Sequence, residues 1–312
     1  MHSEISHSTS NSSFTDEIGL REFFMMLWND KITLILIIIL AATFSVYFAL
    51  SQPNIYSSTA LLSPANNSSN NSSSISSRYG GLASLAGISV DNGQVSDVGL
   101  GIEILKSRVF IVDFIKRRDI LVTLFAMKSW DGESSKIIYN DYYDQESKKW
   151  LGDWPGGEPS YQEAFEKFTQ MMTVIQNKKN GLVTISITHQ SPVIAQQWTM
   201  WLVEDINKTM RNRAVTEAKN SILFLQKEIE STKLSELRVM FSRMIEEQTK
   251  TIMLANVRPE YLFTVIDPPI IPERKTGPIR SQISIIGTIL GAIFGILYLF
   301  LRRYGPELFS EN

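Results

Sequence analysis

The chain has no cysteine and only three histidines among its 312 residues. Without cysteine it can form neither disulfide bonds nor thiolate metal sites, so any part outside the cytoplasm must be stabilised by core packing and assembly. His2 and His7 lie in the N-terminal tail, which leaves His189 beyond it. A single histidine at the end of a strand is usually polar surface. Nucleophilic or metal catalysis has no visible set of residues, so we expect no enzyme and no cofactor.

An excess of basic charge is also missing. Lys and Arg number 30 against 32 Asp and Glu, which gives a formal net charge of −2. A basic stripe or a strongly positive domain is the usual footprint of nucleic-acid binding, and neither is present. We therefore expect no nucleic-acid partner.

Charge of either sign is missing from two long apolar runs, residues 32–50 and 281–301. Each is close to the ~20 residues that a helix needs to cross the hydrocarbon core of a bilayer. A cleaved signal peptide is the alternative for the first run, but this run begins late, is longer than a usual h-region and lacks a convincing cleavage site. We predict two transmembrane helices in contact with membrane lipid.

Basic residues flank the first run on one side only. Arg21 and Lys31 precede it, whereas the next basic residue after it is Arg78, so the positive-inside rule keeps the N-terminus in the cytoplasm. Two spans then return the C-terminus to the cytoplasm. The predicted organisation is a cytoplasmic tail with a short amphipathic helix at 1–31, transmembrane helices at 32–50 and 281–301, an external domain at 51–280 and a cytoplasmic tail at 302–312.

The external domain mixes helix and strand patterns. Apolar residues at helical spacing predict one helix over 96–117. Ser160 with Glu163 forms a capping box that begins a second helix. Strands are predicted at 55–62, 182–188 and 261–265.

Residues 193–255 contain neither proline nor glycine. A continuous helix from about 192 to 255 would approach ~95 Å, so we expect a break near Ser231 and Thr232, with Thr232 capping the segment that follows. The apolar stripe on both sides is too narrow for a full core and suits neighbouring helices. The predicted fold is an α+β membrane protein in which two transmembrane helices flank an extracytoplasmic α+β base with a long helical protrusion.

Proline and glycine mark the approach to the second span and the span itself. Four prolines lie just before it: Pro268, Pro269, Pro272 and Pro278. Because proline fixes φ and favours extended backbone, we interpret this connection as a rigid membrane-proximal segment. Three glycines recur at every fourth residue of the span, which permits close contact with another transmembrane helix: Gly287, Gly291 and Gly295.

Tryptophans are the candidate ligand contacts. Trp198 and Trp201 recur at helical spacing with other apolar residues, so we expect them to pack against the base. Three further tryptophans lie in an insert with Gly and Asp and are candidate carbohydrate contacts: Trp130, Trp150 and Trp154.

Several segments, spread from end to end, match the pattern of a known family. They are EIGLREFFMMLW before the first span, YSSTALLSP after it, GGLASLAGI at 80–88, ILKSRVFIVDFI at 104–115, and ELRVMFSRMIEEQTKTIMLANVRPEYLFTVIDPPIIPER at 236–274. The last is the most specific, because it runs from a Glu-rich helix through an R-x-E-Y strand into a proline-rich approach to the span. The chain resembles the Wzz-type polysaccharide co-polymerases, chain-length determinants of the bacterial inner membrane.

This resemblance implies a periplasmic domain that assembles as a ring-shaped homo-oligomer. It implies a role in setting the modal length of a surface polysaccharide, such as lipopolysaccharide O-antigen, made by a Wzy-type polymerase. The growing polysaccharide is a further candidate partner. Our hypothesis is that the proline segment passes movement of the ring to the glycine-faced helix, where the polymerase is contacted.

The alternative interpretation is a membrane adaptor for capsule or exopolysaccharide export, acting with a separate cytoplasmic tyrosine kinase. Some relatives are fused to such a kinase. The sequence has no G-x-x-x-x-G-K-[ST] motif, so no kinase is expected within this polypeptide.

Overall fold

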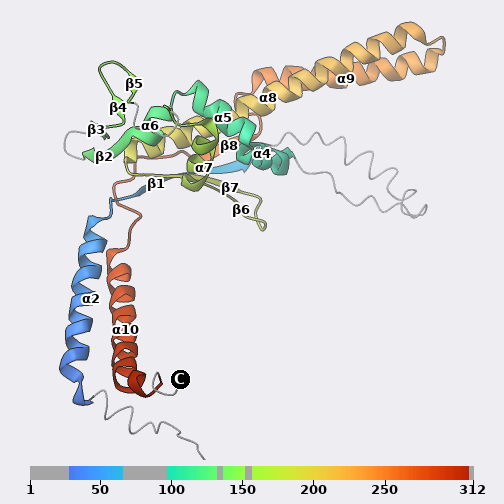
Figure 1. The fold of residues 1–312 in the computed structure, drawn as a ribbon. Helices are drawn as coiled ribbons and strands as arrows, with labels where there is room; N and C mark the ends of the chain where they lie inside the picture. The colour runs from blue at the N-terminus through green and yellow to red at the C-terminus, as the bar shows by residue number, and fades with distance from the viewer. Residues whose placement is uncertain (1–27, 66–96, 132–135, 152–156, 309–312) are drawn as a thin grey trace, which may run out of the picture. The chain divides into compact units, whose positions relative to one another are not determined.

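The computed structural model describes residues 28–65, 97–131, 136–151 and 157–308 (Figure 1). The predicted carbohydrate contact Trp154 and the glycine segment at 80–88 lie outside these residues. The chain divides into two compact units, one made of residues 1–52 with 278–312 and the other of residues 53–277.

The first unit contains two helices, α2 (Lys31–Ser51) and α10 (Arg280–Leu308). Both are long and apolar enough to cross a membrane. The helices pack against each other, and buried Ser45 of α2 donates a hydrogen bond of 3.0 Å to the Ile283 carbonyl of α10. The two spans predicted from the sequence are therefore present as a helix pair.

The second unit is built on a four-stranded sheet with the order β6-β7-β1-β8, antiparallel throughout. Its strands are β1 (Tyr56–Pro64), β6 (Met172–Gln176), β7 (Val183–His189) and β8 (Phe263–Asp267). Side chains in β7 alternate between buried and half-buried, as the sequence predicts for a half-buried strand. The strand predicted at 261–265 begins two residues later, at Phe263.

The helix predicted over 96–117 is in fact two helices, α4 (Asp97–Lys106) and α5 (Arg108–Arg117). Ser107 separates them because its side chain accepts a hydrogen bond of 3.3 Å from the Phe110 amide and so caps α5. The break turns the apolar face of each short helix toward the core.

Two further helices complete the base, α6 (Leu121–Ala126) and α7 (Tyr161–Met171). The capping box predicted at Ser160 and Glu163 is present and begins α7. Helix and sheet side chains form one core, whose largest fully buried members include Leu62, Phe114, Phe168, Ile185, Ile187, Trp198 and Leu202. Trp198 packs against Phe168 with ring centroids 5.7 Å apart, so its predicted packing role is confirmed.

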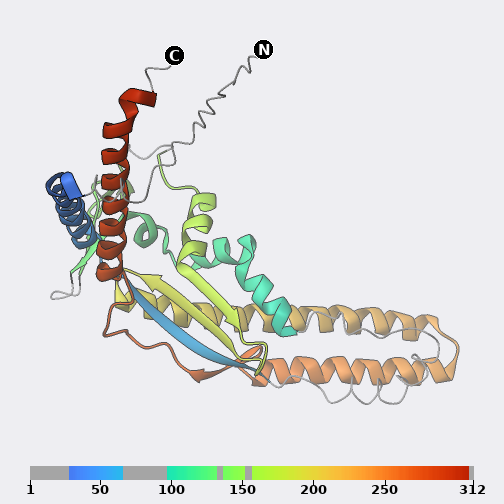
Figure 2. The same ribbon diagram turned by 90° about the horizontal axis from the view of Figure 1, so that it is seen from below.

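A helical hairpin extends from the base (Figure 2). α8 (Pro192–Ser231) has 40 residues, which corresponds to ~60 Å of helix. The chain then turns back as α9 (Ser235–Val257), which packs against α8. The break predicted near Ser231 is confirmed, but Thr232 closes α8 rather than beginning α9, whose N-cap is Leu234.

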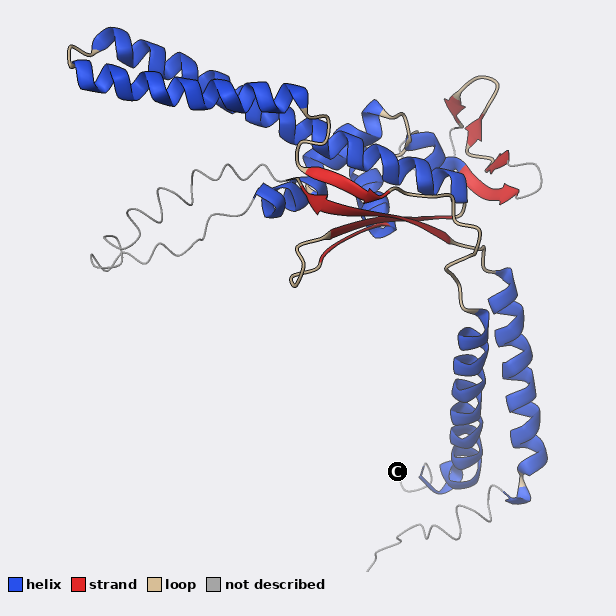
Figure 3. Cartoon of the chain, turned by 180° about the vertical axis from the view of Figure 1, so that it is seen from behind, coloured by secondary structure: helices blue, strands red, loops and turns tan. Residues whose placement is uncertain are grey.

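The insert after α6 forms two small hairpins (Figure 3). One pairs β2 (Met127–Asp131) with β3 (Lys136–Tyr139), and the other pairs β4 (Tyr143–Asp144) with β5 (Lys149–Trp150). The sequence did not predict these strands, because they are short and have no long alternation of apolar and polar residues.

Candidate functional site

The proline segment is docked on the base. After β8 ends at Asp267, the Pro269 carbonyl accepts a hydrogen bond of 3.2 Å from Gln196 of α8. The Ile270 carbonyl accepts one of 2.8 Å from the Ser58 hydroxyl of β1. The segment is thus held by side chains from two elements as well as by its own prolines.

The predicted glycine face lies against α2. A Cβ added at Gly291 would overlap the Cβ of Ala41, and one added at Gly287 would lie 2.6 Å from the Cβ of Ser45. Gly295 faces Leu34 and Ile37. The helix that approaches the glycines closely is therefore α2 of the same chain, and a polymerase would have to contact another face of the pair.

The described tryptophans of the insert lie in different surroundings. Trp150 is partly buried against the core and meets Tyr143 edge to face, with ring centroids 5.2 Å apart. Trp130, in β2, lines a pocket with Tyr56 and Gln190. The structure therefore does not bring these two tryptophans together in one site.

His189 is buried, with 5% of its surface exposed, and the expectation of a polar surface position is wrong. Its ring meets Trp198 edge to face at 5.0 Å between centroids, and its Nδ1 accepts a hydrogen bond of 3.0 Å from the Ser191 amide. Burial, together with the nearby charge of Lys167, lowers the pKa of His189 to about 4. The imidazole is therefore neutral at physiological pH and serves as a structural acceptor at the start of α8.

A buried carboxylate joins α5 to α8. Asp205 is 3% exposed and accepts a hydrogen bond of 2.8 Å from Arg118, while Arg117 lies 3.5 Å from it. Arg118 also lies over the ring of Trp201, at 4.9 Å from its centroid. Nothing in the local sequence pattern identified this cluster.

Asn207 of α8 is a second buried polar residue that the sequence pattern did not reveal. Its Oδ1 accepts hydrogen bonds of 2.8 Å from the amides of Leu262 and Phe263, and its Nδ2 donates one of 3.0 Å to the Phe263 carbonyl. The Asn207 side chain therefore fixes the start of β8 to α8.

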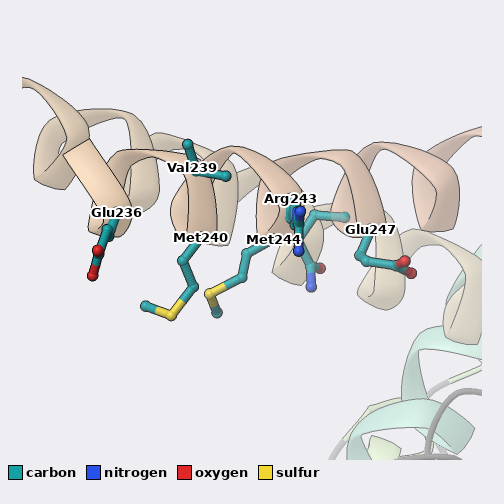
Figure 4. A pocket seen from close by; sticks show the side chains of 7 residues that line it. Glu236, Val239, Met240, Arg243, Met244 and Glu247 are labelled. Atoms are coloured by element: carbon teal, nitrogen blue, oxygen red, sulfur yellow. The ribbon is translucent and has the colours of Figure 1, made fainter.

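The helical hairpin of α8 and α9, the arm, carries an exposed apolar surface on α9. This surface, the α9 face, is made of Val239, Met240 and Met244. Met240 and Met244 point to the same side of the helix (Figure 4). They line a groove of about 510 Å³ that is edged by Glu236, Arg243 and Glu247. An exposed apolar face of this kind suits contact with another protein surface.

Among the described residues no group of three or more His, Asp or Glu side chains is placed to hold a metal ion. The buried polar residues His189, Asp205 and Asn207 each have partners that explain their positions. The surface features described above are the helix pair, the proline segment, the Trp130 pocket and the α9 face.

Comparison with known families gives one match, to the family described as "Wzz: Chain length determinant protein", over residues 16–117. The match covers about a third of the chain and includes the first span, β1, α4 and α5. The family that matches over these residues is the one that the sequence resembles.

Solved structures similar to the chain include two polysaccharide co-polymerases. One, "full-length bacterial polysaccharide co-polymerase", has 13% identity and a TM-score of 0.38, with 94% of this chain and 100% of that chain covered. The other, "Fragment of WzzB, Polysaccharide Co-polymerase from Salmonella Typhimurium", has 14% identity and a TM-score of 0.29, with 72% and 100% covered. Comparison with curated protein sequences gives no match.

Proposed function

We propose that this protein is a polysaccharide co-polymerase of the bacterial inner membrane that regulates the modal length of a surface polysaccharide, such as lipopolysaccharide O-antigen. A Wzy-type polymerase makes the polymer, and the protein acts on that process without a catalytic site of its own. The observation that carries the proposal is the family match over residues 16–117.

The two candidate spans support a membrane location. In the proposed topology both termini are cytoplasmic, the transmembrane segments lie at 32–50 and 281–301, and residues 51–280 form the periplasmic domain. The basic residues Arg21 and Lys31 before the first span favour this orientation.

The α9 face supports a ring-shaped homo-oligomer. Val239, Met240 and Met244 are 55%, 47% and 46% exposed and line one groove, so they form an exposed apolar patch rather than scattered single residues. In a ring, each arm would cover the apolar face of its neighbour, and the alternating charges of Glu236, Arg243 and Glu247 would edge the contact.

The oligomer is tested with the double variant Met240→Lys and Met244→Lys. We expect smaller particles by light scattering of the purified full chain, because burying two lysine ammonium groups in an apolar contact carries a large desolvation cost. Met253→Lys is the matched control, since Met253 lies on the same helix, is 63% exposed and does not line the groove. Particles of unchanged mass in the double variant would contradict the proposed contact.

The function is tested by the electrophoretic ladder of surface polysaccharide from cells with and without the protein, with the polymerase kept in place. The proposal expects deletion to turn a clustered length distribution into a random one while polymer is still made. Loss of all polymer would instead favour the export adaptor, and an unchanged ladder would refute both.

The proposed role of the proline segment is tested by replacing Pro268, Pro269, Pro272 and Pro278 with Gly and Ser. Loosening this connection is expected to broaden the length distribution at an unchanged protein level. Pro259→Ser is the matched control, because Pro259 precedes β8 and lies outside the segment. A distribution equal to that of the unaltered protein would show that rigidity here does not matter.

A further inference from the structure

A small pocket lies where the chain enters the base from the first span. It has a volume of about 310 Å³ and is lined by Pro53, Asn54, Tyr56, Ser129, Trp130 and Gln190. Ligand pockets run from ~300 to ~1,000 Å³, so this one is at the small end. It suits a single small unit rather than a long segment of polymer.

Three elements build the pocket and each is fixed. The stretch before β1 is held by backbone hydrogen bonds, from the Ile55 amide to Gly277 at 2.9 Å and from the Thr276 amide to Ile55 at 2.8 Å. Trp130 comes from β2, where a register shift between Met127 and Ser129 alters the direction of the side chains. The pocket walls are therefore ordered before any ligand arrives.

Gln190 comes from the connection between β7 and α8. Its neighbours on both sides are buried, and the Ser191 amide is bonded to His189. The Gln190 side-chain carbonyl is itself buried, yet it accepts no hydrogen bond within the described part of the chain. A buried acceptor without a donor is costly, and such groups in folded proteins commonly await a water or a ligand.

The chemistry of the lining limits the ligand. None of the six lining side chains is charged. The Lys275 ammonium donates a hydrogen bond of 3.5 Å to the Asn54 Oδ1, so the lining itself offers a phosphate or a carboxylate no ion pair. A purely apolar ligand would leave the buried Gln190 carbonyl without a donor. The lining thus favours a neutral molecule with both C–H faces and hydroxyl groups.

Among the described residues no aromatic or cationic side chain stacks on the Trp130 ring, which is half-buried at the pocket wall. Tyr56 provides a second ring. The negative face of an aromatic ring attracts C–H groups, and a pyranose presents several C–H bonds on one face with hydroxyls at its edge. The geometry points to a binding pocket for one neutral sugar unit, with Trp130 and Tyr56 on the ring and Gln190 accepting from a hydroxyl.

The position of the pocket fits a sugar carried close to the membrane. Pro53 follows the end of α2 at Ser51 by two residues, so the pocket wall begins within ~7 Å of chain from the candidate span. This inference deepens the proposed function and rests on it: the pocket would hold a membrane-proximal sugar of the polymer whose length the protein regulates.

The test is saturation-transfer NMR on the full chain in phosphatidylethanolamine nanodiscs, which avoids sugar-headed detergents. The probes are the methyl glycosides of galactose, mannose and rhamnose. We expect transfer to ring C–H protons of at least one of them. Trp130→Ala should reduce it at least fivefold, Trp130→Phe should retain most of it, and Gln190→Leu should weaken binding by roughly threefold to tenfold.

Trp150→Phe is the matched control, because Trp150 belongs to the same insert but packs against Tyr143 and not into the pocket. No transfer to any neutral glycoside would overturn the inference, and so would an equal loss in Trp150→Phe or stronger binding of methyl glucuronide. The proposed function fails separately, through an unchanged polysaccharide ladder on deletion, whereas the pocket fails when Trp130→Ala binds glycoside as well as the unaltered protein.

Discussion

Replacing Asn207 with leucine is expected to destabilise the protein by about 3 kcal/mol, through loss of about 1 kcal/mol for each backbone group left without its partner. Three groups are affected: the amides of Leu262 and Phe263 and the carbonyl of Phe263. Asn207 is 5% exposed, so water cannot easily replace the amide. Leucine has a similar size, which limits any additional cost of a cavity.

This loss is a large share of the ~5–15 kcal/mol that stabilises a typical domain. It should be concentrated at the junction of α8 and β8. The measurement is thermal unfolding of the full chain in detergent, followed by near-ultraviolet circular dichroism, together with hydrogen exchange at Leu262 and Phe263. Faster exchange of these two amides is expected even where the global change is modest.

The matched control is Asn212→Leu, because Asn212 lies on the same helix but is exposed. Its effect should stay within about 0.5 kcal/mol. A loss below ~1 kcal/mol in Asn207→Leu, with protection at Leu262 and Phe263 unchanged, would refute the reasoning, because the buried amide would then not be the partner of the strand.

Three further outcomes follow from the packing. His189 is neutral in the folded protein because its pKa is about 4, below its ordinary value. Its contribution to the free energy of unfolding is therefore fully present above pH ~6.5 and is lost at ~1.4 kcal/mol per pH unit as the pH falls toward 4. Unfolding scans at pH 7.5 and 5 should show this loss, and His189→Asn, which keeps an acceptor but does not titrate, should show a smaller one. Gly291→Val should destabilise the α2–α10 pair by about 1–3 kcal/mol because its side chain meets Ala41, whereas exposed Ile289→Val should not; equal melting in detergent would contradict the close approach. Asp205→Asn should cost roughly 2 kcal/mol, since the partner Arg118 is partly exposed, and unchanged stability would mean that the ion pair contributes nothing.

Local signals in the sequence were sufficient for the elements whose causes are local. The two spans follow from uncharged runs of the right length, and the capping box at Ser160 follows from two residues three positions apart. The alternation in β7 and the break at Ser231 are likewise visible in neighbouring residues. Periodicity and capping depend on contacts within one turn or one strand, so they can be inferred without the fold.

Tertiary structure alone decided which polar residues are buried with partners and which aromatic residues line a pocket. Asn207 and Leu262 are 55 positions apart, and no pattern in either segment shows that the Asn207 side chain accepts a hydrogen bond from the Leu262 amide. Trp130 and Trp150 look alike in sequence, but one lines a pocket and the other packs against Tyr143. The sequence by itself determined an α+β chain with two candidate membrane spans and a segment that matches the Wzz chain length determinant family. The long-range pairing of strands and helices decided its buried polar contacts and its pocket, because burial depends on distant segments that meet only in the folded chain.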